Sequence, residues 1–251
     1  MSDIKRVIQM NHYRLASFLF LLIAAAVTVS SCSDASLVDP PAPQWGVGGE
    51  LVFDSYSVDT SNGFWRTAPD STVRYKLTDD DAAIHGRTGV SVLVSSTDSI
   101  LIGRMANGDA EFFLNRFAIA LLPIPKLWTP LPFITQRDAT FMDFDTSLAI
   151  GSYNLVIAGN ALAHYAGTEE YSAPGITRLS TVRTEIVATA HATAAVLKVG
   201  SLDMDGTVWF VPATNIIARS DIKLEVSNLL TGADADKSGT SLRLKEIVYP
   251  K

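Results

Sequence analysis

The sequence of 251 residues contains a single cysteine, Cys32, so no disulfide bond can form within one chain. It has no Gly-x-Ser-x-Gly turn and no phosphate-binding glycine loop, two common marks of catalytic sites. After residue 31 the histidines are His85, His164 and His191, and their spacing matches no zinc-binding motif. We therefore expect a protein that is not an enzyme and that carries no cofactor.

Basic residues are also scarce, with 20 lysines and arginines against 26 acidic residues. Residues 1–31 hold three of the basic residues and one of the acidic residues, so residues 32–251 have a net charge of −8. An acidic chain of this kind lacks the electrostatic footprint of a nucleic-acid-binding protein. We expect no nucleic-acid partner.

The chain begins with a segment that is typical of a bacterial signal peptide. Residues 15–29 carry no charge and follow a short leader that contains Lys5, Arg6 and Arg14. Fifteen apolar residues fit the hydrophobic region of a signal peptide, because a membrane-spanning helix needs about 20.

The junction Val29-Ser30-Ser31-Cys32 resembles a bacterial lipobox. This resemblance implies that residues 1–31 are cleaved and that Cys32 is acylated, which anchors the protein to a membrane. The alternative is a buried thiol near an uncleaved anchor. Ser33 after the cysteine resembles the enterobacterial signal for the outer membrane, so we expect a lipoprotein in the envelope of a Gram-negative bacterium.

The rest of the chain divides into a tether and a folded region. Residues 32–49 are rich in proline and glycine and predict a tether that holds the domain near the membrane. Residues 50–251 predict one β domain, or two halves at about 50–127 and 128–251.

The folded region shows the alternation of β-strands. In residues 72–78, Val73, Tyr75 and Leu77 alternate with polar residues, as in a strand with one wet face. The other segments of this kind are 89–94, 99–104, 109–120, 151–158, 181–199, 206–211, 216–226 and 241–248. The expected turns are Asn107-Gly108, Gly159-Asn160, Asp205-Gly206 and Ser238-Gly239. We predict an all-β fold: a curved, mostly antiparallel sheet that forms an open half-barrel or clam, or a sandwich.

Two segments predict an apolar surface inside this sheet. The predicted strand 181–199 carries Ala190, Ala192 and Ala194, whose small side chains leave space for a ligand or for a second sheet. Residues 118–134 are almost wholly apolar but contain four prolines, which exclude a regular helix or an internal strand. This segment plugs one end of the fold, lines a cavity as a flap, or inserts into the membrane. Its candidate ligand-lining residues are Leu127, Trp128, Leu131 and Phe133.

The second half of the chain resembles uncharacterised bacterial secreted proteins of the TapB-like type. The resemblance rests on residues 185–199, on Trp209-Phe210-Val211-Pro212 and on Arg219. Asn215 lies near the position at which that pattern has a turn glycine. After glycine, asparagine is the residue that best tolerates a positive φ. The resemblance implies an open β-clam similar to LolA and LolB and adds Trp209 to the candidate lining. It implies no catalytic residue.

Residues 234–239 resemble the first half of a calcium-binding loop, with Asp234, Asp236 and Ser238 as possible ligands. The position of the bidentate glutamate holds Lys245 instead, so we interpret the segment as a solvated hairpin loop and expect no metal site.

Together these observations predict a membrane-anchored, non-catalytic lipoprotein that binds a lipid or another apolar small molecule in a curved β-sheet. The alternative is a structural or protein-interaction module of the envelope with a closed core and no ligand.

Overall fold

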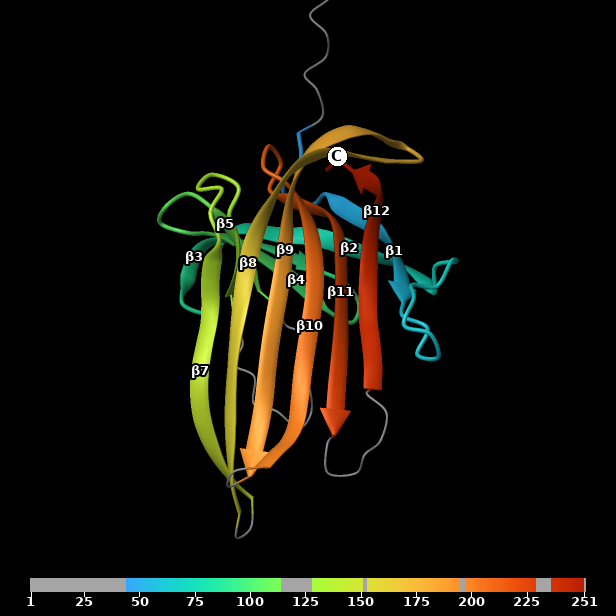
Figure 1. Ribbon diagram of the computed structural model, residues 1–251. Coiled ribbons are helices and arrows are strands. Elements are labelled where there is room, and N and C mark those ends of the chain that lie inside the picture. The colour runs from blue at the N-terminus through green and yellow to red at the C-terminus, as the bar shows by residue number, and fades with distance from the viewer. Residues whose placement is uncertain (1–43, 114–127, 151–152, 195–196, 229–235, 251) are drawn as a thin grey trace, which may run out of the picture. The chain divides into compact units, whose positions relative to one another are not determined.

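Strands make up most of the part of the chain that the structure describes (Figure 1). This computed structural model describes residues 44–250 without 114–127, 151–152, 195–196 and 229–235, and no helix occurs among them. The described residues belong to one unit, Gln44–Lys251. The strands are β1 (Glu50–Ser57), β2 (Ser71–Ile84), β3 (Arg87–Val94), β4 (Ser99–Arg104), β5 (Ala110–Phe113), β6 (Trp128–Leu131), β7 (Ala139–Ile150), β8 (Tyr153–Ala173), β9 (Ile176–Ala194), β10 (Leu197–Val211), β11 (Ile216–Asn228) and β12 (Asp236–Val248). The predicted all-β class is confirmed.

The strands form one sheet in the order β6-β5-β4-β3-β2-β1-β12-β11-β10-β9-β8-β7, and neighbouring strands are antiparallel throughout. β1 lies between β2 and β12, so Glu50 pairs with Lys76 on one side and with Val248 on the other. From β1 the chain meanders outward to β6, and from β7 it meanders back to β12. The predicted antiparallel sheet is therefore built from two halves, β1–β6 and β7–β12.

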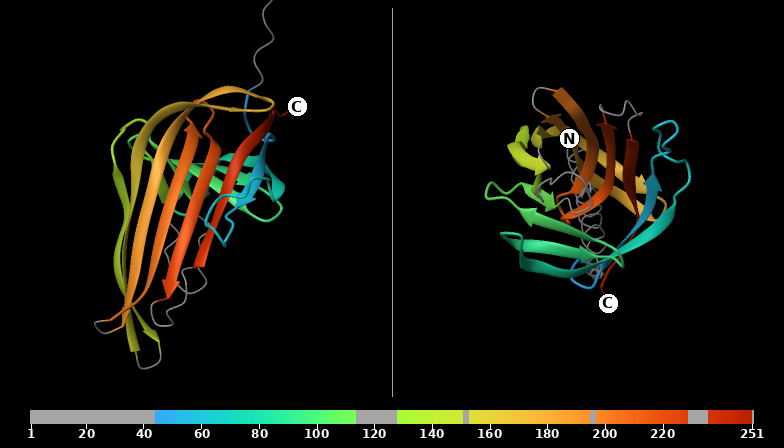
Figure 2. Two further views of the ribbon diagram at one scale, coloured as in Figure 1. Left: turned by 45° about the vertical axis from the view of Figure 1, so that its right-hand side comes forward. Right: turned by 90° about the horizontal axis from the view of Figure 1, so that it is seen from below.

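The sheet curves until its two edges approach each other. The edge strands β6 and β7 follow each other in the chain, and residues 132–138 join them. Asp109, which is 2% exposed, holds this connection: its carboxylate accepts bonds from the backbone N–H of Ile134 at 2.7 Å and from the Thr135 hydroxyl at 2.7 Å. Seen from below, the two halves face each other across the interior (Figure 2). The predicted curved, mostly antiparallel sheet is confirmed, and it is more nearly closed than the predicted open clam (Figure 2).

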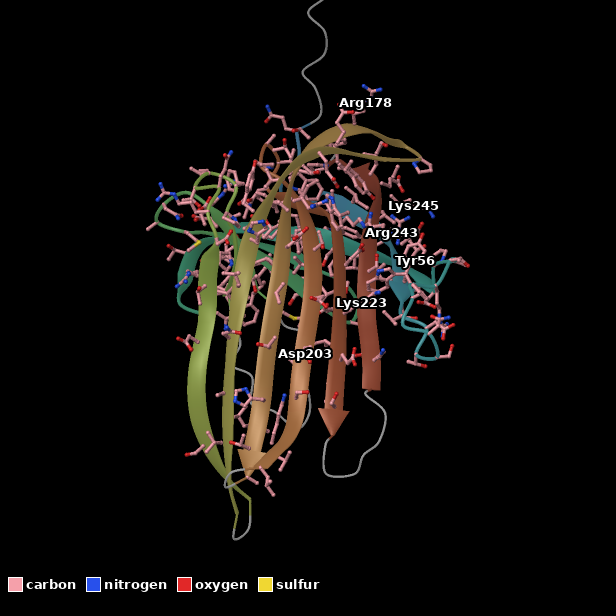
Figure 3. All side chains as sticks on the ribbon, viewed as in Figure 1. Tyr56, Arg178, Asp203, Lys223, Arg243 and Lys245 are labelled. Atoms are coloured by element: carbon pink, nitrogen blue, oxygen red, sulfur yellow. The ribbon has the colours of Figure 1, made fainter. Side chains whose placement is uncertain are left out.

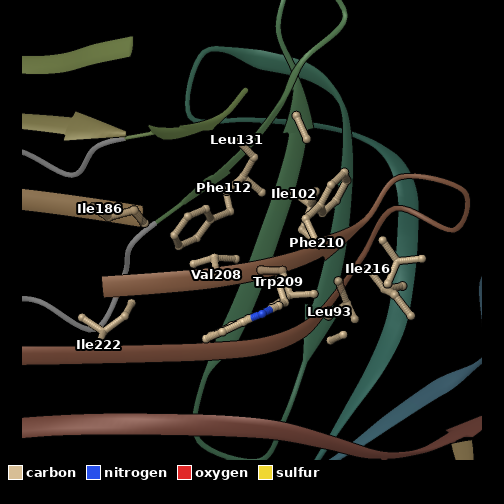
Figure 4. Close-up of a cluster of buried hydrophobic side chains, with 14 of the residues drawn as sticks. Leu93, Ile102, Phe112, Leu131, Ile186, Val208, Trp209, Phe210, Ile216 and Ile222 are labelled. Carbon is tan, nitrogen blue, oxygen red and sulfur yellow. The ribbon is translucent and has the colours of Figure 1, made fainter. Parts of the chain in front are cut away.

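The main hydrophobic core lies between the two halves. Figure 4 shows Ile102 and Phe112 from the first half close to Val208 and Phe210 from the second half. Phe210 has no exposed surface, and its ring packs on Phe133 with 5.4 Å between the centroids. Apolar side chains at every second position of each strand supply this core, because alternate residues point to the same face.

Several predicted strand boundaries differ from the structure. The segment 181–199 is not a single strand, because β9 ends at Ala194 and β10 begins at Leu197. The predicted strand 99–104 coincides with β4, whereas 206–211 is only the end of β10. Of the segment 109–120, residues 110–113 form β5 and residues 114–120 lie outside the described part.

Three of the four predicted turns lie inside strands. Gly159-Asn160, Asp205-Gly206 and Ser238-Gly239 fall within β8, β10 and β12. Close packing explains Gly239, because a Cβ there would lie 2.7 Å from the carbonyl oxygen of Ile222. Asn107-Gly108 does connect β4 to β5, with a φ of 87° at Gly108. Asn215, between β10 and β11, has the expected positive φ, at 57°.

Candidate functional site: a cavity between the two halves of the sheet

A cavity of about 380 Å³ lies between the two halves of the sheet. One wall comes from β1, β2, β4 and β5, and the opposite wall comes from β11 and β12. The described lining residues are Phe53, Tyr75, Asp98, Ser99, Ile100, Phe112, Phe113, Ile217, Ser220, Ile222, Leu224, Ser238, Gly239, Thr240 and Leu242.

The two walls differ in chemistry. The first half of the sheet contributes aromatic rings, and two of them, Phe53 and Tyr75, meet edge to face with 5.8 Å between centroids. The second half contributes branched aliphatic side chains such as Ile222 and Leu242. An apolar molecule between these walls would contact side chains on both sides.

Polar groups are few and are mainly hydroxyls. They belong to Ser99 on β4, Ser220 on β11 and Ser238 and Thr240 on β12. Asp98 adds one carboxylate, and the Tyr75 hydroxyl lies 3.5 Å from its Oδ2. A mostly apolar lining with a few polar groups is typical of small-molecule sites in proteins.

Local turns hold these polar groups in place. The turn before β4 is closed by Ser95, whose backbone N–H donates to the carbonyl oxygen of Asp98 at 2.8 Å and whose hydroxyl donates to the same oxygen at 3.0 Å. On the opposite wall, β12 lies so close to β11 that only a glycine fits at position 239. Both features fix the backbone that carries the hydroxyls.

The proline-rich segment is placed in part. Trp128 begins β6 on the outer face of the first half, where its indole N–H donates to the carbonyl oxygen of His85 at 3.2 Å. Leu131 is fully buried in the main core, and Phe133 packs against Phe210. Leu127 lies outside the described residues. Trp128, Leu131 and Phe133 are not among the residues that line the 380 Å³ cavity.

The alanines of β9 lie on the inner face of the second half. Ala190 and Ala192 are buried and Ala194 is half-buried, and the first two share a face with Ile186 of the core. Ala190 stands opposite Gly159 on β8 and Leu202 on β10. These alanines do not line the cavity either.

Trp209 points to the outer face of β10, away from the cavity. Its indole N–H donates to the carboxylate of Glu169, and the guanidinium of Arg219 lies 4.3 Å from the ring centroid. Glu169 belongs to the hairpin between β8 and β9, residues 166–180, which arches across the outer face toward β12 (Figure 1). We call this hairpin the strap, and Trp209 is 8% exposed beneath it.

A second side-chain hydrogen bond fixes the strap to β12. The Tyr171 hydroxyl donates to the carbonyl oxygen of Leu244 on β12 at 2.6 Å. Burial raises the pKa of Tyr171 to about 12, and the neighbouring charges of Arg219 and Arg243 lower it only in part. Figure 3 shows Arg178 on the strap and Lys245, Arg243 and Tyr56 below it.

The remaining predicted positions are Cys32, Asp234, Asp236 and Ser238. Asp234 and Cys32 lie outside the described residues, Asp236 begins β12, and Ser238 lines the cavity. Among the described residues no group of three or more histidine, cysteine, aspartate or glutamate side chains is arranged to hold a metal ion. The same residues contain no helix long and apolar enough to cross a membrane.

Sequence reasoning did not select the residues of this cavity as a set. Their strands were partly anticipated by alternation, as in residues 72–78, 99–104 and 216–226. What brings them together is the pairing of β1 with β12, which depends on residues almost 200 positions apart, such as Glu50 and Val248.

No family model, curated protein or solved structure matches this chain significantly. The resemblance to TapB-like proteins and to LolA and LolB stays a prediction.

Proposed function

We propose that this protein is a membrane-anchored, non-catalytic lipoprotein of the cell envelope that binds an apolar small molecule between the halves of its sheet. The observation that carries the proposal is the cavity of about 380 Å³ with aromatic residues on one wall and aliphatic residues on the other. Its volume lies within the usual range of ligand sites, about 300–1,000 Å³.

The binding part of the proposal is tested by photolabelling of the full-length chain. Membranes from cells that produce the protein receive an apolar aryl-diazirine probe, and peptide mass spectrometry locates the labelled residues. We expect label on Phe112 and Leu242, which line opposite walls.

A variant that fills the cavity sharpens this test. Ser220→Trp adds a large side chain to the wall on β11, whereas Ser227→Trp, on the same strand, adds it outside the lining. We expect Ser220→Trp to lose the cavity label and Ser227→Trp to keep it, with circular dichroism verifying that both variants fold. Equal labelling of the two variants would favour the alternative, a structural or protein-interaction module with a closed core.

The membrane anchor is a separate part of the proposal and rests on the lipobox-like residues 29–32. Metabolic labelling with an alkyne fatty acid is expected to modify the native chain, and Cys32→Ser is expected to abolish the label. Label that persists in this variant would argue against acylation at Cys32. The density of the membrane fraction that contains the protein then tests whether the protein lies in the outer membrane.

A further inference from the structure

The size of the cavity limits what it can hold. A volume of about 380 Å³ lies near the lower end of the range for ligand sites, about 300–1,000 Å³. A phospholipid with two acyl chains is much larger than this volume. A single chain or one compact ring system fits, and its apolar body would contact rings such as Phe53 and Phe112 on one side and Ile222 on the other.

The hydroxyls of Ser220 and Thr240 are available for a ligand. In the part of the chain that the structure describes, no hydrogen bond joins the side-chain hydroxyls of Ser220 and Thr240 to another protein group. Each hydroxyl can donate one hydrogen bond and accept others. Such groups at a cavity wall suit an oxygen atom on an otherwise apolar molecule.

Two of these hydroxyls are placed to act on the same group. Thr240 on β12 and Ser220 on β11 are diagonal neighbours, because Ser220 stands opposite Leu242, two residues after Thr240. Diagonal neighbours on one face of an antiparallel pair lie about 7–8 Å apart at their Cα atoms. One ligand oxygen can therefore lie near both side chains.

The described lining disfavours an anionic ligand. Among the described lining residues there is no lysine, arginine or histidine. An anion moved from water into an apolar site costs several kcal/mol unless an opposite charge or several hydrogen bonds compensate it. Neutral hydroxyl and carbonyl groups do not carry this cost.

We infer that the cavity takes one compact amphiphile that carries no negative charge, with its apolar body between the two walls and a hydroxyl or carbonyl oxygen at Ser220 and Thr240. This inference rests on the proposed ligand-binding function and narrows it to a chemical class. It excludes free fatty acids and two-chain phospholipids as the ligand.

Competition against a photoreactive alcohol tests the chemical class. Membranes that contain the full-length chain at pH 8 receive a diazirine analogue of 1-dodecanol, and label is measured on the peptides that carry Phe112 and Leu242. The competitors are 1-dodecanol, dodecanoate and dimyristoyl phosphatidylcholine, compared at equal mole fraction in the membrane. We expect dodecanoate to compete at least tenfold more weakly than the alcohol, and the phospholipid not to compete.

Substitutions test the two hydroxyls. Ser220→Ala and Thr240→Val are each expected to weaken the binding of 1-dodecanol about threefold to tenfold, the effect of one lost hydrogen bond. Ser227→Ala, on the same strand outside the lining, is expected to leave it unchanged.

The possible failures are distinguishable. If dodecanoate competes as well as the alcohol, or if the phospholipid fills the cavity, the inferred class is wrong while ligand binding stands. If both hydroxyl variants bind the alcohol as the native chain does, Ser220 and Thr240 do not hold its oxygen. If neither the alcohol nor the aryl-diazirine probe labels the lining, the proposed function itself fails.

Discussion

The two halves of the sheet both cover part of their outer face, but they do so with different chemistry. In the first half, the turn after β2 and the start of β3 lie against β5. The ring of His85 stacks on that of Phe113, with 4.3 Å between the centroids, and the Arg87 guanidinium bonds to the buried carboxylate of Glu111. In the second half the strap covers Trp209 and is held by side-chain bonds from Trp209 and Tyr171. Antiparallel sheets commonly leave one face to water, so each cover is an addition to the basic fold.

The difference lies in what each cover buries. Beneath the first one is a separate cluster of buried apolar residues, Val90, Leu101 and Phe113. The strap instead contributes half-buried residues such as Tyr171, Ile176 and Leu179, together with exposed charges. We infer that the cover of the first half is part of the stable core and that the strap opens at a lower free energy.

The largest expected effect comes from shortening a leucine beneath the first cover, compared with a leucine within the strap. Leu101 is 3% exposed, so Leu101→Ala is expected to lower the free energy of unfolding by about 3 kcal/mol through lost burial and a cavity. Leu179→Ala, in the half-buried strap, is expected to cost about 1 kcal/mol. Urea unfolding of the two variants measures both values, and equal losses would break the comparison.

The next effect tests the buried carboxylate of the first half. Glu111 is 2% exposed and accepts a bond from the Arg87 Nε at 2.5 Å. Glu111→Ala is expected to lower the free energy of unfolding by about 2 kcal/mol. This loss is smaller than for a fully buried ion pair, because the Arg87 side chain is 44% exposed and can be rehydrated. Glu111→Gln serves as the control that keeps the shape. A loss below 0.5 kcal/mol, the size typical of surface changes, would show that this pair contributes little to the cover.

A smaller effect, with a distinct pH dependence, is expected at the strap. Tyr171→Phe removes the hydrogen bond to the Leu244 carbonyl oxygen and is expected to lower the free energy of unfolding by about 1 kcal/mol at pH 7. The folded-state pKa of Tyr171 is about 12, above the unfolded value of about 10, so the folded state keeps its proton longer. The contribution of Tyr171 to the free energy of unfolding is therefore complete below pH 10 and is lost as the pH rises from about 10 to 12.

The pH dependence is measured by urea unfolding of the native chain and of Tyr171→Phe at several pH values. The free-energy difference between them is expected to shrink across that alkaline interval. A difference that stays constant up to pH 12 would contradict the assignment to Tyr171.

The smallest effect is expected at an exposed ion pair of the strap. Arg178 lies 3.6 Å from Glu170, but their side chains are 80% and 64% exposed. Arg178→Ala is expected to change the free energy of unfolding by less than 0.5 kcal/mol. A larger loss would mean that this ion pair contributes more to holding the strap than the bonds of Trp209 and Tyr171 do.

Alternation along the chain predicted the fold class and the positions of several strands. It failed at the end of β9, because the sequence near residues 195–196 has no glycine, proline or asparagine to indicate a turn. It also mistook Gly239 for a turn residue, because a glycine needed for close packing looks the same in the sequence as one needed for a positive φ. This second error comes from a contact with a neighbouring strand, which local patterns do not contain.

The candidate site was less accessible to sequence reasoning than the fold. The resemblance to TapB-like proteins added Trp209 to the candidate lining, yet Trp209 packs beneath the strap on the outer face. Its role depends on Glu169, forty positions away, and on the bend of the hairpin between them. The cavity likewise depends on the register between strands from opposite ends of the chain, such as Phe53 opposite Leu244.

The place of β1 between β2 and β12 also sets the order in which the protein can be completed. A chain made from its N-terminus offers β1 early, but one side of β1 has no partner until residues 236–248 exist. Contacts between such distant segments slow folding, because a long loop must close before they form. The sheet thus stays incomplete until the last strand has emerged, and the cavity, whose second wall includes β12, is the last part to take shape.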